Sequence, residues 1–318
     1  MFGSPIELFR LAGIPIRLDR SWFAIAILVV WSLATGFFPV AQPGLTPAAY
    51  WVMGAAAALG LFGSIVVHEL FHAIVARRHH IPMGGITLFV FGGVAEMQAE
   101  PETPRAEWRM AIAGPLASIA IAGVAFGAAE LASAFEPLRG TTAVRSVLRY
   151  LAAINGLLAA FNLLPAFPLD GGRLLRAVLW RRRGDLRWAT RVASRAGRGF
   201  SLVLMGLGGV RVLLGDLLGG VWSFLLGSFL GRAATGSYQQ LLVRHALRGT
   251  PVSRFMTPDP VTVPPEITVG ELVEEYVYKY HHKLFPVVAD GRLLGCISTN
   301  QIKALRDLLG VPADLLLQ

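Results

Sequence analysis

The chain has 318 residues, of which 54% are hydrophobic and only 15% are charged, and its mean hydropathy is +0.56. Soluble domains contain roughly 45–50% apolar and about 25% charged residues, so this composition argues against a water-soluble enzyme. Its single cysteine, Cys296, excludes an intrachain disulfide and a zinc site built from several cysteines. The net charge is +9, but the basic residues lie in short segments between apolar blocks, which argues against a nucleic-acid partner.

The apolar residues are concentrated in blocks that are long enough to cross a membrane. A bilayer core of about 30 Å requires roughly 20 helical residues. Arg10, Arg17 and Arg20 precede the first block, which is long, rich in tryptophan and not followed by a small-residue cleavage site, so we expect an uncleaved span. The sequence predicts about six transmembrane helices, near residues 21–38, 48–77, 108–134, 143–164, 198–214 and 217–232.

Residues 81–97, between the second and third spans, differ from the apolar blocks. The run 86–91 is rich in residues that favour β-strands, and glycine pairs bound it on both sides. We therefore expect a membrane-associated β-hairpin. An open hairpin cannot expose unpaired backbone groups to lipid, so it must lie at the interface or beside a water-filled cavity.

The positions of the basic residues predict the orientation of the chain in the membrane. The arginines before the first span, then Arg77 and Arg78, then the group from Arg173 to Arg195 all fall on one side of an alternating six-span arrangement. By the positive-inside rule that side is cytoplasmic. We expect a multi-pass protein of the cell membrane with both termini in the cytoplasm.

The composition changes near residue 236, where acidic residues, lysines and turn signals appear. The sequence therefore predicts a membrane domain over 1–235 and a small cytoplasmic α/β domain over 236–318. In the second domain, periodicity predicts a strand at 261–263, a helix at 269–280 and a closing helix at 300–308. It also predicts a hairpin of 284–288 with 293–297 that turns at Asp290-Gly291.

The second span contains His68, Glu69 and His72 in the pattern H-E-x-x-H. On a helix the two histidines lie one turn apart on one face, where both imidazoles can bind one Zn²⁺, and Glu69 is offset so that it can act on water. The alternative is that these side chains only form polar contacts between helices. Ionisable groups at the centre of a membrane cost about 2.5 kcal/mol or more, so three of them within five residues favour a functional site.

Two histidines leave a zinc site one protein ligand short, and Asp170 is the candidate for the third. It follows Pro165 and Pro168, which break the fourth span, and broken backbone at membrane depth is tolerated only beside a cavity or under protein cover. The alternative is an ordinary loop aspartate before two glycines. Few other acids compete, because those near the hairpin only flank it: Glu96, Glu100, Glu102 and Glu107.

His68-Glu69-x-x-His72, followed by Asn162-x-x-Pro165-x-x-Pro168-Leu169-Asp170-Gly171, resembles the site-2 protease family of intramembrane zinc metallopeptidases. Segments 91–94 and 113–117 match it too, and the resemblance covers about residues 10–232. It implies one Zn²⁺ held by His68, His72 and Asp170, with Glu69 as general base and acid and Asn162 near the substrate backbone. It further implies hydrolysis of a peptide bond in or near a transmembrane segment of a membrane protein, in regulated intramembrane proteolysis. Phe71 stands where many members have a small residue and is expected to narrow the cavity.

Residues 250–308 resemble a single CBS motif, through segments 256–258, 285–288 and 295–298. Such motifs work in pairs and often bind adenine nucleotides, but the expected ribose-binding aspartate is Gln301 here, which counts against a nucleotide. The ten residues after Leu308 are too few for a second motif. Either two chains pair their motifs in a homodimer, or the protein continues beyond Gln318. Cys296, on an apolar strand, is expected to be buried.

The expected partners are therefore a transmembrane protein substrate, the lipid bilayer and a second copy of the chain. An extended substrate could add to the edge of the hairpin at 86–94 as a further strand, although the hairpin could equally serve only to cover the cavity. Two other functions stay open. A CBS-regulated transporter is expected to have repeated halves with matching helix breaks, whereas this sequence has one break, at 165–168. A non-catalytic homologue that binds membrane segments is expected to have lost Glu69 or a ligand, and none is missing.

Overall fold

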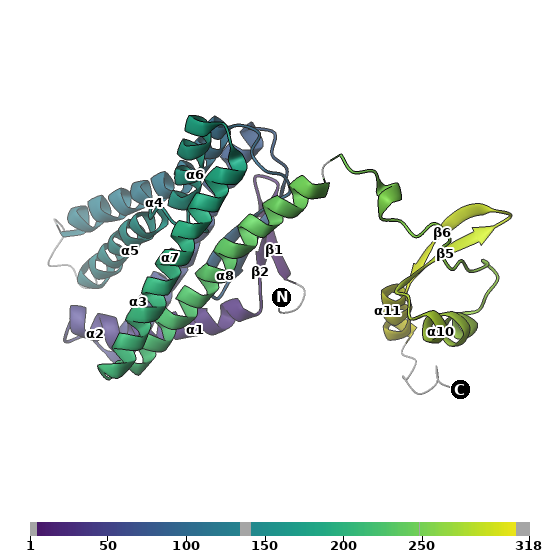
Figure 1. Cartoon of the computed structure of the whole chain (residues 1–318). Helices are drawn as coiled ribbons and strands as arrows, with labels where there is room; N and C mark the ends of the chain where they lie inside the picture. Colours follow the sequence, from purple (N-terminus) through teal and green to yellow (C-terminus); the bar gives the residue numbers. More distant parts are fainter. Residues whose placement is uncertain (1–4, 134–140, 248, 310–318) are drawn as a thin grey trace. The chain divides into compact units, whose positions relative to one another are not determined.

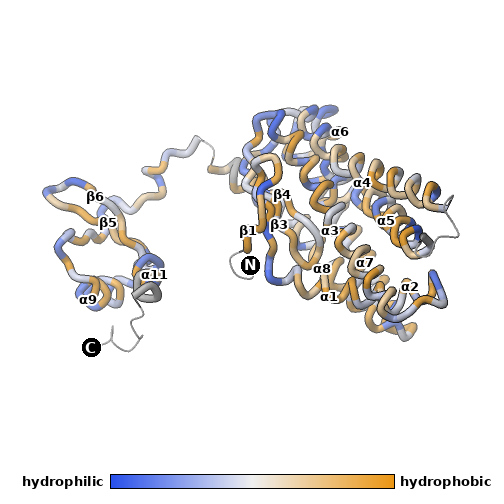
Figure 2. The backbone as a smooth tube through the Cα atoms, turned by 180° about the vertical axis from the view of Figure 1, so that it is seen from behind, coloured by the Kyte–Doolittle hydropathy of each residue, from blue (hydrophilic) through white to orange (hydrophobic). Residues whose placement is uncertain are grey.

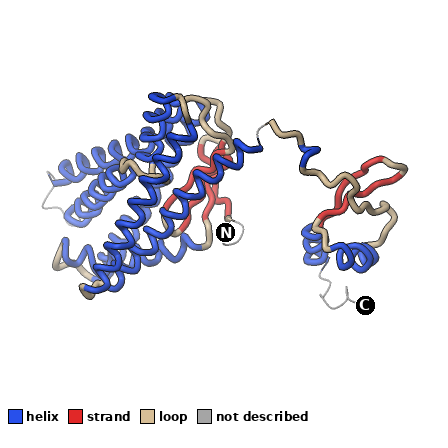
Figure 3. The backbone as a smooth tube through the Cα atoms, viewed as in Figure 1, coloured by secondary structure: helices blue, strands red, loops and turns tan. Residues whose placement is uncertain are grey.

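The computed structural model describes residues 5–133, 141–247 and 249–309 of the chain (Figure 1). The chain divides into two compact units, Met1–His245 and Ala246–Gln318. The first unit is mainly helical with one small sheet, and the second is a small α/β unit with a two-stranded sheet. Figure 3 shows both units by secondary structure.

Six helices of the described residues are long and apolar enough to cross a membrane, as the sequence predicts. Figure 2 shows their predominantly hydrophobic composition, against the hydrophilic segment around α6 (Asp170–Arg183). The protein is thus a multi-pass membrane protein. The six spans are Ser21–Ala41, Pro47–Arg78, Pro104–Ser133, Thr142–Asn162, Leu186–Leu213 and Leu217–Val243.

The first four spans form the core of this unit. The first comprises α1 (Ser21–Ser32), a π-helical turn (Leu33–Phe37) and α2 (Phe38–Ala41). The second is α3 (Pro47–Arg78), which begins where the Thr46 hydroxyl accepts a hydrogen bond from the backbone N–H of Ala49. The third, α4 (Pro104–Ser133), packs against α3, against α5 (Thr141–Asn162) and against α6, so it touches every element that carries a predicted site residue.

The last two spans, α7 (Leu186–Leu213) and α8 (Leu217–Leu247), are longer than the sequence analysis predicts. Asp185 caps α7 by accepting a hydrogen bond from the backbone N–H of Trp188, so the helix begins well before residue 198. The first half of α7 carries several arginines. Because the span was predicted from its apolar block, this charged half was left out of the prediction.

The sheet of the first unit has four strands in the order β1-β2-β3-β4. Strands β3 (Met83–Phe89) and β4 (Gly92–Met97) form the predicted hairpin. Strands β1 (Ile6–Leu11) and β2 (Ile14–Leu18) were not predicted, and β2 pairs in parallel with β3. The buried face of β2 packs on α3 in a core of Ile14, Ile16, Ala73 and Ile86. The fourth strand, β4, is left at one edge of this sheet.

The second unit contains the predicted helix, hairpin and closing helix. Its core consists of Val263, Leu272, Phe285 and Ile302. Val263 forms an isolated parallel bridge to Val287 where a short strand was expected. The prediction for Cys296 was wrong, because β6 exposes this side chain. After a 3₁₀ turn (Val252–Arg254), the elements are α9 (Val269–Glu271), a π-helical turn (Leu272–Val277), α10 (Tyr278–Tyr280), β5 (Leu284–Ala289), β6 (Arg292–Ser298) and α11 (Thr299–Leu309).

Candidate active site

His68 and His72 lie one turn apart on α3, and their Nε2 atoms are 3.2 Å apart. Both side chains are buried, at 3% and 5% exposure. They are buried because α4 passes directly over them at Gly114. A Cβ atom at that position would lie 2.2 Å from His72 Nε2 and 2.6 Å from His68 Nε2, so only glycine allows this close approach.

The outer ring nitrogens of both histidines are held by α4. His68 Nδ1 lies 2.9 Å from the Ser118 hydroxyl, and His72 Nδ1 lies 2.7 Å from the backbone carbonyl oxygen of Met110. A carbonyl only accepts, so His72 donates from Nδ1 and keeps the lone pair of Nε2 free. This second contact is typical of histidines that bind metals, because it fixes the tautomer and the orientation of the ring.

Asp170 closes the cluster from the first residue of α6. Its Oδ2 atom lies 3.1 Å from the Nε2 atoms of both His68 and His72. Its carboxylate oxygen therefore completes a group of three possible ligand atoms with the two imidazole nitrogens.

The donor set fits zinc. Two imidazole nitrogens and one carboxylate oxygen are the protein ligands of many catalytic zinc sites, in which a fourth position stays open. Ligand atoms bound at ~2.0–2.1 Å in a tetrahedron lie about 3.3–3.4 Å apart. The three ligand atoms here are 3.1–3.2 Å apart, so only a small expansion separates them from that geometry. The three side chains thus form a group that could hold a metal ion.

Glu69 lies beside the cluster, in the wall of a cavity of about 380 Å³ that His68, His72 and Asp170 also line. Among the described residues, no hydrogen bond engages its carboxylate. Strand β4 packs tightly against it, because a Cβ atom at Gly93 would come within 2.9 Å of Glu69 Cγ. Glu69 can therefore act on a molecule in the cavity without first giving up a protein partner.

Most of the rest of the cavity wall comes from the edge strand β4, the end of α5 and one face of α8, and β3, α4 and α6 also contribute residues. Phe229 of α8 stacks on Phe91 with the ring centroids 4.5 Å apart, which joins the hairpin to α8 in the cavity wall. The lining is mostly apolar, as expected for a site that receives a membrane segment.

Asn162, at the last residue of α5, also lines the cavity. Its side-chain amide donates to the Leu158 carbonyl at 3.0 Å, so the side-chain oxygen stays available. Asn155 differs, because it is fully buried and donates to the Ser64 hydroxyl of α3 at 3.0 Å. It joins α5 to α3, as expected of a polar residue in helix packing.

The acids near the hairpin do not join the histidines. Glu96 accepts hydrogen bonds from Arg17 and Thr87. Glu100 and Glu107 both bind Arg176 of α6. Among the candidate third ligands whose contacts the structure describes, only Asp170 therefore lies next to the two histidines.

Two residues of this region differ from expectation. Phe71 is 46% exposed and is not part of the cavity wall, so the expectation that it narrows the cavity was wrong. Arg173 was not predicted, yet it lines the cavity, and its Nη1 lies 3.7 Å from the sulfur of Met97. It follows Asp170 by three residues on the same helix, and this spacing was the available signal.

Comparison with known proteins finds two families that match parts of this chain. The profile of peptidase family M50 matches residues 56–137 and 133–204, and that of the CBS domain matches 252–305. Rip3 of Mycobacterium tuberculosis, whose name assigns it provisionally to the zinc metalloproteases, is 40% identical over 299 residues, 94% of this chain and 75% of its own. The chain belongs to peptidase family M50, the site-2 protease family.

Other relatives match much of the chain at lower identity. The sll0528 protein of Synechocystis, also provisionally named a zinc metalloprotease, is 34% identical over 94% of this chain and 77% of its own. The zinc metalloprotease MJ0392 of Methanocaldococcus jannaschii is 31% identical over 93% of this chain and 79% of its own. A solved site-2 protease from the same organism is 28% identical, with a TM-score of 0.49 over 73% of this chain and 94% of that chain.

Proposed function

We propose that this chain is an intramembrane zinc metalloprotease that hydrolyses a peptide bond in or near a transmembrane segment of a membrane protein. One observation carries the proposal. Two histidines and an aspartate, drawn from elements about a hundred residues apart, converge beside a free carboxylate in a cavity between apolar helices. In this proposal His68, His72 and Asp170 hold Zn²⁺. Once bound, the ion polarises a peptide carbonyl and lowers the pKa of water toward about 7.

Glu69 carries the protons in this proposal. Its free carboxylate accepts a proton from the attacking water and then returns it to the nitrogen of the leaving amine. One residue serves both steps, and no covalent intermediate with the protein is formed. The absence of competing hydrogen bonds among the described residues supports this role, because the carboxylate loses no partner when it turns to the water.

The substrate backbone is held by β4 and Asn162. A peptide bond in a transmembrane helix is shielded by helical hydrogen bonds, so the substrate must locally unwind before it can react. Residues 92–95 and Met97 of β4 line the cavity, and β4 is an edge strand within the described sheet. An unwound segment can pair with that edge as a fifth strand, which recovers the lost hydrogen bonds. The side-chain oxygen of Asn162 accepts a backbone N–H from the other side.

Cleavage of membrane substrates by the purified chain tests the proposal. A panel of single-span membrane proteins, tagged at both ends, is incubated with the detergent-solubilised full chain, and the fragments are located by mass spectrometry. We expect cuts in or next to the membrane segment of some panel members, loss of cleavage with a zinc chelator and recovery when Zn²⁺ is returned. Cleavage that persists after verified removal of zinc contradicts the mechanism. Tight capture of panel members without cleavage by the zinc-loaded chain favours a non-catalytic membrane-segment-binding protein.

A further inference from the structure

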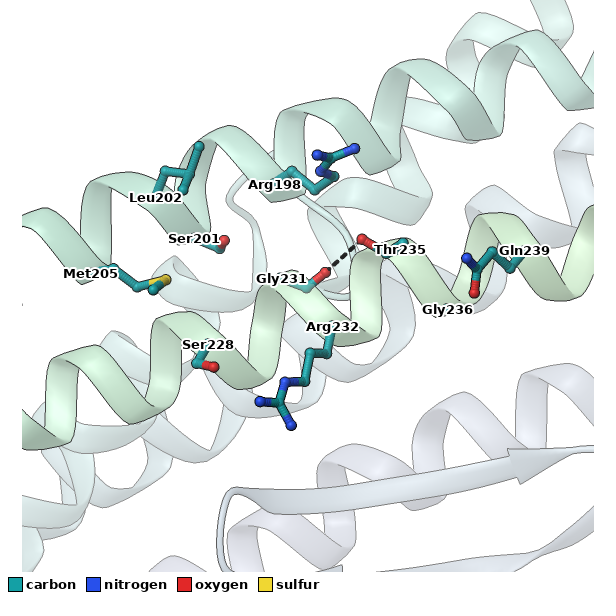
Figure 4. Close-up of a pocket in the computed structure, with 10 residues that line it drawn as sticks. All are labelled: Arg198, Ser201, Leu202, Met205, Ser228, Gly231, Arg232, Thr235, Gly236 and Gln239. Carbon is teal, nitrogen blue, oxygen red and sulfur yellow. Dashed lines mark hydrogen bonds between the residues drawn. The ribbon is translucent and has the colours of Figure 1, made fainter.

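A second polar site lies between α7 and α8, apart from the proposed active site. Here a groove of about 470 Å³ runs along the two helices, and Figure 4 shows the residues that line it. Next to it lies a smaller pocket of about 230 Å³, and the two hollows share Arg198 and Thr235. Neither hollow shares a lining residue with the cavity around Glu69.

The smaller pocket is rich in hydrogen-bond donors and has no carboxylate in its wall. Its lining residues are Arg191, Ser194, Arg195, Arg198, Thr235 and Tyr238. Within the described part of the chain, none of its three arginines forms an ion pair. Arg191 donates from Nε to the Tyr238 hydroxyl at 2.9 Å, which places that hydroxyl beside the arginines. The pocket thus has the charge and the donors to bind an anion.

Ser194 gives independent evidence for a ligand in this pocket. Its side chain is only 4% exposed, and its hydroxyl has no hydrogen-bond partner among the described residues. Helical hydroxyls commonly bond the carbonyl four residues earlier, and Thr190 and Thr235 both do so here. Leaving a buried hydroxyl unpaired is unfavourable. An acceptor atom in the pocket would remove that cost.

The larger groove connects the arginines with an apolar surface. It runs from Arg198 along Ser201 and Gly231 to Leu202 and Met205. Its floor is formed where the helices nearly touch, since a Cβ atom at Gly231 would lie 2.6 Å from the Ser201 hydroxyl oxygen. Figure 4 shows Arg198 on α7 and Arg232 on α8, with the Arg232 side chain directed away from α7. A ligand that fits both hollows has an anionic end and an apolar body.

The uncharged segments next to these arginines are short for a bilayer core. The uncharged segment 199–210 separates Arg198 from Arg211 and rises about 18 Å. The segment 217–231 separates Asp216 from Arg232 and rises about 22 Å. Both segments are shorter than the roughly 30 Å of hydrocarbon. The arginine side chains must therefore extend outward to the lipid phosphate groups, or the phosphate groups must move inward to the arginines.

We propose that the pocket and groove between α7 and α8 bind an anionic phospholipid, with the headgroup phosphate held by Arg195, Arg198 and Ser194. The phosphate oxygens accept from the two guanidinium groups and from the Ser194 hydroxyl. The glycerol and the first part of the acyl chains lie in the groove beside Leu202 and Met205. A free phosphate has the same headgroup chemistry but leaves this apolar groove empty.

Lipid retention by the full chain tests the proposal. The detergent-solubilised protein is exposed to equal amounts of phosphatidylglycerol and phosphatidylcholine with identical acyl chains, and bound lipid is counted by native mass spectrometry. We expect wild type to retain phosphatidylglycerol about tenfold over phosphatidylcholine, because both lipids carry the phosphate but only phosphatidylcholine also brings a choline cation close to the three arginines. Equal retention of the two lipids by wild type overturns the proposal without any variant.

Variants then locate the site. Arg195→Gln combined with Arg198→Gln is expected to abolish the preference. Arg211→Gln is the matched control, because Arg211 lies on the same helix and pairs instead with Asp216. If both variants keep the wild-type preference, or if both lose it alike, the site is not in this pocket.

Two further measurements separate the source of the phosphate and the role of Ser194. Glycerol 3-phosphate and inorganic phosphate are expected to displace phosphatidylglycerol only weakly. Displacement at concentrations close to that of the lipid assigns the site to a soluble phosphate instead.

Ser194→Ala is expected to melt no lower than wild type without lipid but to gain less thermal stability from phosphatidylglycerol. An equal gain in the two proteins removes Ser194 from the site.

Discussion

The proposed metal ligands come from two distant segments, and Asp170 is the residue on which the geometry depends most. Its Oδ2 atom is equally close to both histidines, at 3.1 Å. The sequence predicts it as a ligand because a broken helix and few competing acids leave little choice. The role of Ser118 could not be predicted, since it arises from a contact between helices that no local pattern records. The position of Arg173 in the cavity wall was missed, although its spacing from Asp170 on the same helix could have indicated it.

We predict that Asp170→Ala lowers zinc affinity by at least about 100-fold. Loss of a residue that only hydrogen-bonds a metal ligand lowers metal affinity by roughly 10–100-fold, and loss of a ligand itself should cost more. The measurement is zinc per protein by mass spectrometry after dialysis against a zinc buffer. Glu102→Ala, an exposed acid near the hairpin, is the control and should keep its zinc. Full zinc occupancy in the Asp170 variant would remove this residue from the site.

Ser118→Ala tests whether α4 orients the first histidine. Its hydroxyl lies 2.9 Å from His68 Nδ1, and Ser118 is fully buried. We predict a loss of about 10–100-fold in zinc affinity with the fold retained, because the ring loses the contact that fixes its orientation. Ser118→Thr keeps a hydroxyl and should recover much of that loss. A competition titration against a chelator measures both variants, and equal affinity of Ser118→Ala and wild type would contradict the role.

At the scale of elements, a buried ion pair joins α6, which carries Asp170, to α4. Arg176 is 4% exposed and binds Glu107, which is fully buried, as well as Glu100. Burial alone would lower the pKa of Arg176, but the two carboxylates raise it above its usual value, so the guanidinium stays charged. The Arg176–Glu107 pair thus links α6, whose first residue is Asp170, to α4, which packs on the histidines of α3.

We predict that Arg176→Met destabilises the protein by about 3–5 kcal/mol, because it leaves the buried Glu107 without its partner. The double variant Arg176→Met with Glu107→Leu should be less destabilised than Arg176→Met alone, since it buries no unpaired charge. Thermal melting in detergent measures both effects. A double variant that is as unstable as the sum of the single variants would contradict a direct interaction.

The elements differ in how far the sequence predicts them. The apolar runs predict six spans, because a helix that is buried in lipid needs a continuous stretch of apolar residues. The strand-favouring run between two pairs of glycines predicts the β3–β4 hairpin, because its residues form a continuous stretch that is buried against the protein. Strands β1 and β2 were missed because they are short and carry charged residues such as Glu7, Arg10 and Arg17. The arginines in the first half of α7 lie outside any apolar run, so the start of that helix could not be located from hydropathy.

At the scale of the whole molecule, the C-terminal unit raises the question of pairing. The sequence predicts a homodimer through single CBS motifs. The exposed β6 strand, with Leu293 65% and Leu294 62% exposed, is consistent with an apolar surface that a second copy covers. The exposure of Cys296 could not be predicted from the sequence of its strand. The alternation of side chains along a strand does not tell which face of the sheet packs against another element.

Cys296 offers a direct test of pairing, because it is the chain's one cysteine and lies exposed on β6. We predict that a spin label on Cys296 of the detergent-solubilised full chain gives a defined label-to-label distance by pulsed electron paramagnetic resonance. Dilution with unlabelled protein should reduce this signal in proportion. A sample without dipolar coupling, together with a monomeric mass, would contradict pairing through this unit.

The central claim is that Glu69 moves protons while His68, His72 and Asp170 hold zinc, and Glu69→Gln separates these two roles. The measurement is zinc content and substrate cleavage on one preparation of Glu69→Gln, beside wild type. We predict unchanged zinc and a loss of cleavage of about 10²–10⁴-fold, the usual contribution of a general acid–base group. Cleavage at the wild-type rate, or loss of zinc from the Gln variant, would contradict the account.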